Sequence, residues 1–327
     1  MVLLVGVVGA VNASTNQYLA HYGTNLGYRM VAAKYDLLAA QHGAEPVDWL
    51  ILGDSSAAHG VVPSAWTEHT GGTSLNLAVV ADLLVANDAW MLAEYLEHVG
   101  SPKNVVLVHA HDIWRRGYNS ALIGQIPRSW GIWSRRAPQI ELLEGHTQKA
   151  FYSHFLPLMS QSSTLRAHLK NRGPTRTIDL RMTERGWIPG QPHTAERVER
   201  DRARTTQRVQ EQRFRMSSHN TRALEVLRTL ADEHGFQLYI THGPMLDTMA
   251  EAEPFQAYVA EADQHVQALV GASDRVTVVP DMVRFPAESM ETTIDHVIPS
   301  VAPAYTRQLA ALVSGVGEPR APGPHDD

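Results

Sequence analysis

Residues 47–55 read VDWLILGDS, and this stretch decides the fold. A short apolar run opens directly onto Gly53, which is typical of a buried parallel strand that ends in a tight turn. Further strands are predicted at 75–80, 104–109, 236–241 and 275–280, and helices at 18–42, 83–98, 252–270 and 299–313. Strands that alternate with helices predict an α/β fold with a doubly wound parallel sheet of about five strands.

Between these elements lie two segments of different character. Residues 113–192 hold four tryptophans, many arginines and several Gly/Pro breaks, which indicates an irregular helical insertion or cap. Residues 193–234 are helical and highly charged, as one long solvated helix or as a pair broken near Ser217-Ser218. We therefore expect a lead-in segment at 1–45, a main domain at 46–316 with the insertion inside it, and a disordered tail at 317–327.

Composition excludes several classes of protein. The chain has 327 residues, 44% of them hydrophobic and 19% charged, as in a soluble globular protein. Its net charge of -6 argues against a nucleic-acid partner. With no cysteine, disulfides, thiolate zinc sites and cysteine nucleophiles are excluded. No two of the 17 histidines have the helical spacing of a zinc site, so neither a metal nor another cofactor is predicted.

The first eleven residues, MVLLVGVVGAV, are apolar without a break. A helix that crosses a bilayer needs about twenty such residues, and a signal peptide normally begins with Lys or Arg. Two interpretations remain open: the run is the outer part of a membrane anchor, or it is a buried N-terminal segment.

The candidate nucleophile is Ser55, directly after the first predicted strand. A serine on a strand-to-helix turn exposes its hydroxyl at the rim of the sheet, and N–H groups at the start of the next helix can stabilise an oxyanion. The alternative is an ordinary helix cap, with Asp54 or Ser55 as the capping residue.

The candidate general base is His296, just before the last helix. Histidine titrates in the range needed to take a proton from serine, and a carboxylate on its other nitrogen would fix the tautomer. Asp295 is the nearest carboxylate in sequence, although adjacent residues on a turn rarely point the same way. The alternative is a capping aspartate beside a surface histidine.

Together, Gly53-Asp54-Ser55 and the late histidine resemble the first and last sequence blocks of the SGNH/GDSL hydrolases. The resemblance implies a flavodoxin-like layering and assigns catalysis to Ser55 and His296. In the second block (75–82), which includes Asn76, the usual oxyanion glycine is replaced by Ala81 or Ala78. In the third, HAHD at 109–112, His111 replaces an asparagine.

The last block also departs from the family pattern. Thr293 stands where members usually carry an aspartate, three residues before the histidine. Asp295, or more weakly the Thr293 hydroxyl, is left to orient His296. We assign Asp295 with Ser55 and His296 to catalysis, and the four residues Ala81, His111, Asp54 and Asn76 to the oxyanion and the substrate.

Within the family, the stretches DWLILGDSSAAHGVVPSAW, SLNLAVV and DHVIPSVAPAYTRQLA look like membrane-anchored, outward-facing members. These are similar to the D-alanyl transfer protein of teichoic-acid modification and to alginate O-acetylation proteins. The resemblance implies an extracytoplasmic serine esterase or O-acyltransferase on acyl esters of a cell-surface polysaccharide or other polymer, beside a membrane-bound O-acyltransferase. No cofactor is implied.

Two alternatives remain. The altered blocks would suit a catalytically impaired binding or assembly protein that partners such an acyltransferase. A cytoplasmic esterase would follow if residues 1–11 are buried. The pair Arg115-Arg116 could bind an anionic polymer, although such pairs more often solvate a loop.

Overall fold

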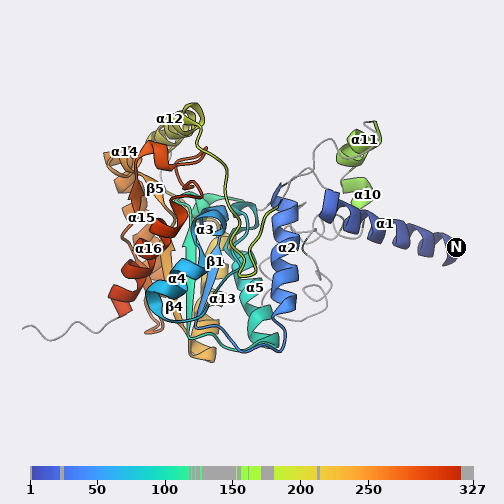
Figure 1. The fold of residues 1–327 in the computed structure, drawn as a ribbon, viewed down its shortest axis with the longest axis horizontal. Helices are drawn as coiled ribbons and strands as arrows, with labels where there is room; N and C mark the ends of the chain where they lie inside the picture. Colours follow the sequence, from blue (N-terminus) through green and yellow to red (C-terminus); the bar gives the residue numbers. More distant parts are fainter. Residues whose placement is uncertain are drawn as a thin grey trace, which may run out of the picture.

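A computed structural model describes residues 2–22, 26–117, 119, 122, 126, 152, 156–160, 162–170, 180–211 and 214–317. At its centre is a parallel sheet of five strands in the order β2-β1-β3-β4-β6 (Figure 1). The strands are β1 (Trp49–Gly53), β2 (Ser74–Asn76), β3 (Asn104–His109), β4 (Gln237–His242) and β6 (Val276–Val279). The predicted fold class is confirmed.

Helices cover both faces of this sheet because its strands are apolar on both sides. Along β1, Leu50 and Leu52 point into one core, whereas Ile51 points into the other. The first core is closed by α2 (Leu26–Ala40), α5 (Leu84–His98), α13 (Ser218–His234) and α15 (Glu253–Val270). The second is closed by α3 (Ser55–Gly60), α4 (Pro63–Thr70) and α16 (Ala302–Gly317). The sheet is therefore doubly wound.

Two details of the sheet differ from the sequence prediction. The strand expected at 75–80 pairs as β2 only to Asn76, and Leu77 and Val79 then follow β1 through single hydrogen bonds to Ile51 and Gly53. A second, two-stranded parallel sheet, β5 (Met245–Leu246) with β7 (Arg284–Phe285), was not predicted. Its strands have two residues each, too few for a periodic pattern.

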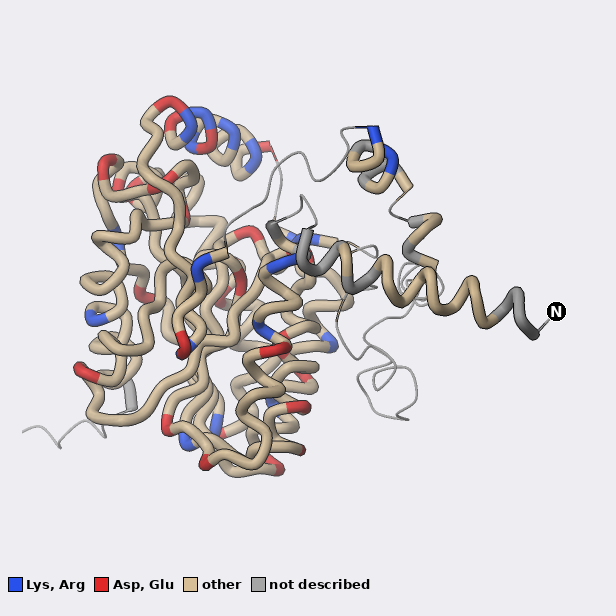
Figure 2. Tube along the Cα trace, turned by 45° about the vertical axis from the view of Figure 1, so that its right-hand side comes forward, with Lys and Arg blue, Asp and Glu red and all other residues tan. Residues whose placement is uncertain are grey.

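The charged segment forms two helices, α12 (Ala195–Glu211) and α13, so the predicted break near Ser217-Ser218 is confirmed. Ser217 caps α13 by accepting a hydrogen bond from the N–H of Asn220. Acidic and basic residues alternate along α12, at the top of Figure 2.

The shorter helices of the described chain are η1 (Ala81–Leu83), η2 (Ile113–Arg115), α10 (Pro157–Ser160), α11 (Ser162–Lys170), α14 (Asp247–Ala250) and η3 (Ala287–Ser289).

The N-terminal region differs most from expectation. In place of one helix at 18–42 there are two, α1 (Val2–Tyr22) and α2, and α1 extends away from the sheet (Figure 1). Val7, Val8 and Val11 are 54%, 43% and 44% exposed, which contradicts a buried segment over residues 6–11. Among the described residues, no helix combines the length and apolar character that crossing a membrane requires. Much of the insertion at 113–192 and the tail from 318 lie outside the described residues.

Candidate active site

The strand order locates the crevice in which a doubly wound sheet binds its ligand. The order reverses between β1 and β3, and ligands in such sheets lie beyond the carboxyl ends of the strands at this switch point. Ser55 follows β1, and His111 lies two residues after β3. Two of the predicted site residues therefore lie at the rim of the same crevice.

The turn that carries Ser55 depends on Gly53. Its φ is +137°, and a Cβ at this position would lie 1.8 Å from the carbonyl oxygen of Val108 on the neighbouring strand. Only glycine allows β1 and β3 to approach so closely at their ends. Ser55 then begins α3 with a partly exposed side chain.

Asp54 fixes this turn from the inside. Its Oδ1 accepts hydrogen bonds from the N–H (2.9 Å) and the hydroxyl (2.6 Å) of Ser56, and its Oδ2 accepts one from the N–H of Ala110 (2.8 Å). The side chain is 1% exposed. The expectation that Asp54 contacts the oxyanion or the substrate is therefore wrong for its carboxylate, which is buried and accepts these internal bonds.

Behind the turn lies a buried chain of charged groups that the sequence did not reveal. His109 donates from Nε2 to Asp88 Oδ2 at 2.8 Å, and its Nδ1 lies 3.4 Å from Asp54 Oδ2. Asp88 Oδ1 in turn accepts the N–H of Gly53 at 2.9 Å. An imidazolium between two carboxylates thus links the ends of β1 and β3 to α5.

The charges of this network follow from its contacts. Burial disfavours the imidazolium of His109, but the Asp88 and Asp54 carboxylates outweigh it and raise the pKa of His109 to about 9. Burial also acts against the Asp54 carboxylate, yet the contacts with His109, Ser56 and Ala110 lower its pKa to about 2. Burial prevails at Asp88 and raises its pKa. At neutral pH we therefore expect a cationic His109 beside an ionised Asp54.

His296 lies on a loop that is closed by short-range backbone pairing. Met290 and Val297 form an antiparallel bridge, and the N–H of Glu291 donates to the carbonyl of His296 at 2.8 Å. From outside, Asp201 on α12 accepts the N–H of Ile294 at 3.1 Å. The loop is therefore anchored at its base and at its tip.

Asp295 contacts His296 despite being its neighbour in sequence. The Nδ1 of His296 donates to Asp295 Oδ1 at 2.6 Å, and Thr293 Oγ1 lies 2.8 Å from the same nitrogen. Thr293 also bonds the Asp295 carboxylate and helps to lower its pKa. The expectation that adjacent residues would point apart is wrong here, because the tight loop turns both side chains inward. With Nδ1 engaged, Nε2 is the nitrogen left to act on a substrate.

Electrostatics favour the charged form of this imidazole. Burial opposes protonation, but the Asp295 carboxylate, with a smaller contribution from Glu291, raises the pKa of His296 to about 9. An imidazole acts as a base only when neutral. Base chemistry at His296 should therefore develop mainly at alkaline pH in the unliganded protein.

His296 lies close to the helix that Ser55 begins. The ring of His59 lies 5.6 Å from that of His296, centroid to centroid. His59 is four residues after Ser55, so the two side chains share one helical face. No hydrogen bond joins Ser55 to His296 within the described residues.

The remaining predicted residues divide into two groups. Ala81 begins η1, where an N–H has no partner within the helix, and it remains a candidate oxyanion donor. His111 is 5% exposed and packs against Phe255, and neither of its ring nitrogens has a hydrogen-bond partner in the described chain. Because His111 also helps to lower the pKa of Asp295, it belongs to the same crevice.

Asn76, by contrast, is wrongly assigned to the oxyanion and the substrate. Its amide is fully buried and makes four internal hydrogen bonds. Nδ2 donates to the carbonyls of Ala57 (2.9 Å) and Val61 (2.8 Å), and Oδ1 accepts from Ala78 N (3.0 Å) and Lys34 Nζ (3.1 Å). Both amide hydrogens are used, so none is left for an oxyanion.

Comparison with known proteins adds little to this geometry. No protein-family model matches the chain, and no curated protein matches it. Among solved structures, it is similar to the "putative platelet activating factor" from Streptococcus pneumonia, at 12% identity and a TM-score of 0.39, over 94% of this chain and 97% of that one. Similarity at this level does not bear on function. What the chain itself defines is its class of fold, a doubly wound α/β protein in which Ser55 follows the strand at the switch point.

Proposed function

We propose that this chain is an SGNH-type serine esterase or O-acyltransferase that acts on acyl esters of a cell-surface polymer. Two observations support the proposal: Ser55 follows β1 at the switch point of the sheet, and His296, which contacts Asp295, has its ring 5.6 Å from that of His59 on the helix that Ser55 begins. A hydroxyl, an imidazole and a carboxylate in this order are the groups that acyl transfer requires.

In the proposed reaction, Ser55 Oγ attacks the acyl carbonyl, and Nε2 of His296 takes its proton. Asp295 holds Nδ1 and stabilises the imidazolium that forms. The N–H groups of Ser55 and Ala81, with the ring of His111, stabilise the oxyanion. His296 then returns the proton to the leaving oxygen. Water or a hydroxyl of a second polymer releases the acyl group from Ser55.

A polymeric, anionic substrate is supported by a groove near the crevice. Arg115, Arg116 and Arg215 line this groove, whose volume is about 630 Å³. Arg116 is held by Asp112 and lies close enough to interact with Asp295. Guanidinium groups bind carboxylates and phosphates well, which suits an acidic glycan or a polyol phosphate.

A serine-directed fluorophosphonate probe tests the nucleophile. At pH 9, where much of His296 is neutral, we expect the purified chain to be labelled on Ser55 and to cleave a generic acetyl ester. Ser55→Ala should abolish both signals. His296→Ala should reduce them by at least about 100-fold, the usual contribution of a general base.

The matched control is Ser64→Ala, which removes an exposed serine hydroxyl from the neighbouring helix α4 and should leave both signals unchanged. Folded protein that is neither labelled nor active at any pH up to 10 would overturn the esterase proposal. Labelling that persists in Ser55→Ala would place the nucleophile elsewhere.

A second candidate is a catalytically impaired binding or assembly protein that partners a membrane-bound O-acyltransferase. The observation that favours it is the lack of a hydrogen bond between Ser55 and His296 in the described residues, together with a pKa of His296 that keeps the imidazole charged at neutral pH. Unlabelled but folded protein that still binds an acylated acidic glycan, with affinity lost on Arg215→Ala, would support this function instead.

A further inference from the structure

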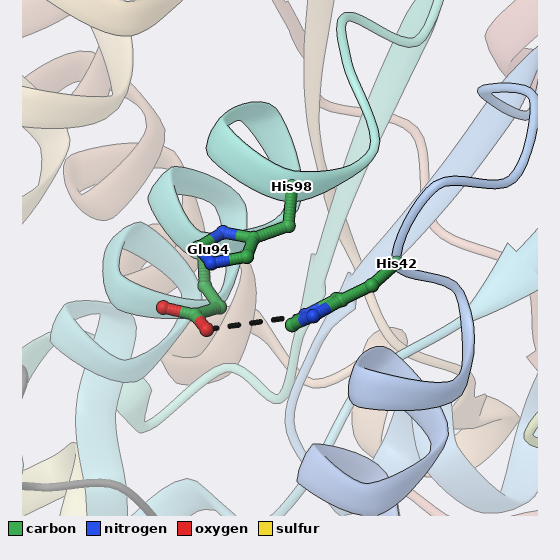
Figure 3. A group of neighbouring side chains, drawn as sticks. All are labelled: His42, Glu94 and His98. Carbon is green, nitrogen blue, oxygen red and sulfur yellow. Dashed lines mark ion pairs between the residues drawn. The ribbon is translucent and has the colours of Figure 1, made fainter.

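Three side chains that can bind a metal ion, His42, Glu94 and His98, lie together at the amino ends of the sheet strands. His42 follows the last turn of α2, and Glu94 and His98 lie one turn apart on α5 (Figure 3). One ligand atom from each of the three lies within 4.8 Å of the others. His42 Nε2 is 4.0 Å from Glu94 Oε1, and the two imidazole rings are 4.3 Å apart between centroids.

Hydrogen bonds join the turn after α2, which contains His42, to the last turn of α5. The N–H of Gly43 donates to the carbonyl of His98 at 3.0 Å, and the N–H of Val47 donates to the hydroxyl of Tyr95 at 2.9 Å. The residues that follow His42 are thus tied to the last turn of α5. Ligands carried by linked, rigid elements need little reorganisation to bind an ion.

The site is separate from the Ser55 crevice. His42 precedes β1 and His98 precedes β3, so both lie at the amino ends of these parallel strands. Ser55 follows β1 and lies at the carboxyl ends. An ion bound here would therefore not contact the reacting groups, and its direct effect would be to join α2 to α5.

The donor set fits one class of ion. Two imidazoles and a carboxylate are ligands that Zn²⁺ accepts, with a water in the fourth position, whereas Mg²⁺ and Ca²⁺ prefer oxygen ligands. Tetrahedral Zn²⁺ with bonds of about 2.0–2.2 Å places its ligand atoms roughly 3.3–3.5 Å apart. The three ligand atoms lie within 4.8 Å of one another, so they would have to approach by up to about 1.5 Å to bind such an ion.

One further observation points to a ligand. His98 Nδ1 is buried and has no hydrogen-bond partner among the described residues. The rings of His42 and His98, which are 4.3 Å apart between centroids and tilted by 33°, lie beside Glu94 (Figure 3). We propose that His42, Glu94 and His98 bind one Zn²⁺ ion, or a divalent transition-metal ion of similar preference, as a clamp between α2 and α5.

Titration of the chelator-treated full chain with ZnCl₂ at pH 7.5, followed by calorimetry, tests this proposal. We expect one ion per chain, a dissociation constant in the micromolar range or below, and a higher Tm at saturating Zn²⁺. Binding only to the folded state raises stability by mass action. Co²⁺ should bind with the visible absorption of a tetrahedral site, and Mg²⁺ should not bind at the same concentrations.

Variants separate this site from adventitious binding. His98→Ala and Glu94→Gln should each weaken Zn²⁺ binding at least tenfold and remove the rise in Tm. The control His69→Ala removes an exposed histidine on α4, outside the cluster, and should change neither. Glu94→Gln keeps the size of the side chain, so it remains informative if His98→Ala does not fold. No stoichiometric binding by the wild type, or equal binding by Glu94→Gln, would overturn the proposal.

Discussion

At the scale of single residues, the proposed chemistry depends on what binds Nδ1 of His296. Asp295 Oδ1 lies 2.6 Å from this nitrogen and Thr293 Oγ1 lies 2.8 Å from it. Asp295 can make this contact because the loop bends enough for its side chain to fold back onto the neighbouring histidine.

We expect Asp295→Asn to shift the pH dependence of ester hydrolysis. In the wild type the rate should rise with pH through about 9, because only neutral His296 accepts the proton and Asp295 raises its pKa to that value. Removing the carboxylate lowers the pKa of His296, so the midpoint should move to lower pH. The plateau rate should also fall, by at least about 100-fold, since an amide no longer fixes the productive tautomer.

The measurement is kcat/KM for an acetyl ester between pH 6 and 10.5. Thr293→Val is the matched control, because it removes a neutral hydroxyl from the same nitrogen and should change the midpoint far less. A midpoint that stays at the wild-type value in Asp295→Asn would show that Asp295 does not set the charge of His296.

Sequence reasoning could propose only site residues that stand beside a recognisable element. Ser55 and His296 stand directly after a strand and before a helix, where a pattern is informative. Asp88 and His109 are 21 residues apart, and no periodicity links them. The only indication of Asp88 and His109 in the sequence is that each is a polar residue at a position of its helix or strand where an apolar residue is expected. Asn76 was misassigned because its block in the sequence does not reveal that its amide already binds four internal partners.

At the scale of elements, the exit of β1 is the most constrained turn of the site. We expect Gly53→Ala to destabilise the protein by about 3 kcal/mol or more, because the new Cβ would overlap the Val108 carbonyl and the backbone has a left-handed φ. Gly71→Ala is the matched control. Its φ is +73° but nothing lies within 4 Å of the new Cβ, so it should cost only about 1 kcal/mol.

Urea unfolding of both variants separates steric overlap from backbone strain. If Gly53→Ala and Gly71→Ala lower the free energy of unfolding equally, β3 must shift to accommodate the added methyl group. If Gly53→Ala folds but the fluorophosphonate probe no longer labels Ser55, the result would also show that the turn positions the nucleophile.

At the scale of the whole molecule, alternation of apolar runs and helices was sufficient to predict the sheet and its double winding. The two central strands β1 and β3 contain continuous apolar runs, WLIL and VVLV, which is the strongest signal that this fold produces. The N-terminal region was not predictable in the same way. Residues 1–11 are apolar, yet the helix they begin exposes Val7, Val8 and Val11. Hydrophobicity alone does not say what a segment packs against.

The buried network of His109 should make the stability of the whole fold depend on alkaline pH. Its pKa is raised from 6.5 to about 9, so the folded state binds a proton that the unfolded state releases at lower pH. This stabilisation, of order 3 kcal/mol, is fully present below pH 6.5 and is lost as pH rises through 9. His296 contributes in the same direction. The free energy of unfolding, measured in urea, should therefore fall between pH 7 and pH 9.5.

Two variants test whether His109 is the source of this fall. Asp88→Asn removes one carboxylate from His109 and should reduce the fall, whereas Asp36→Asn, at an exposed position, should not. An equal fall in wild type and Asp88→Asn would refute a charged His109 as its source.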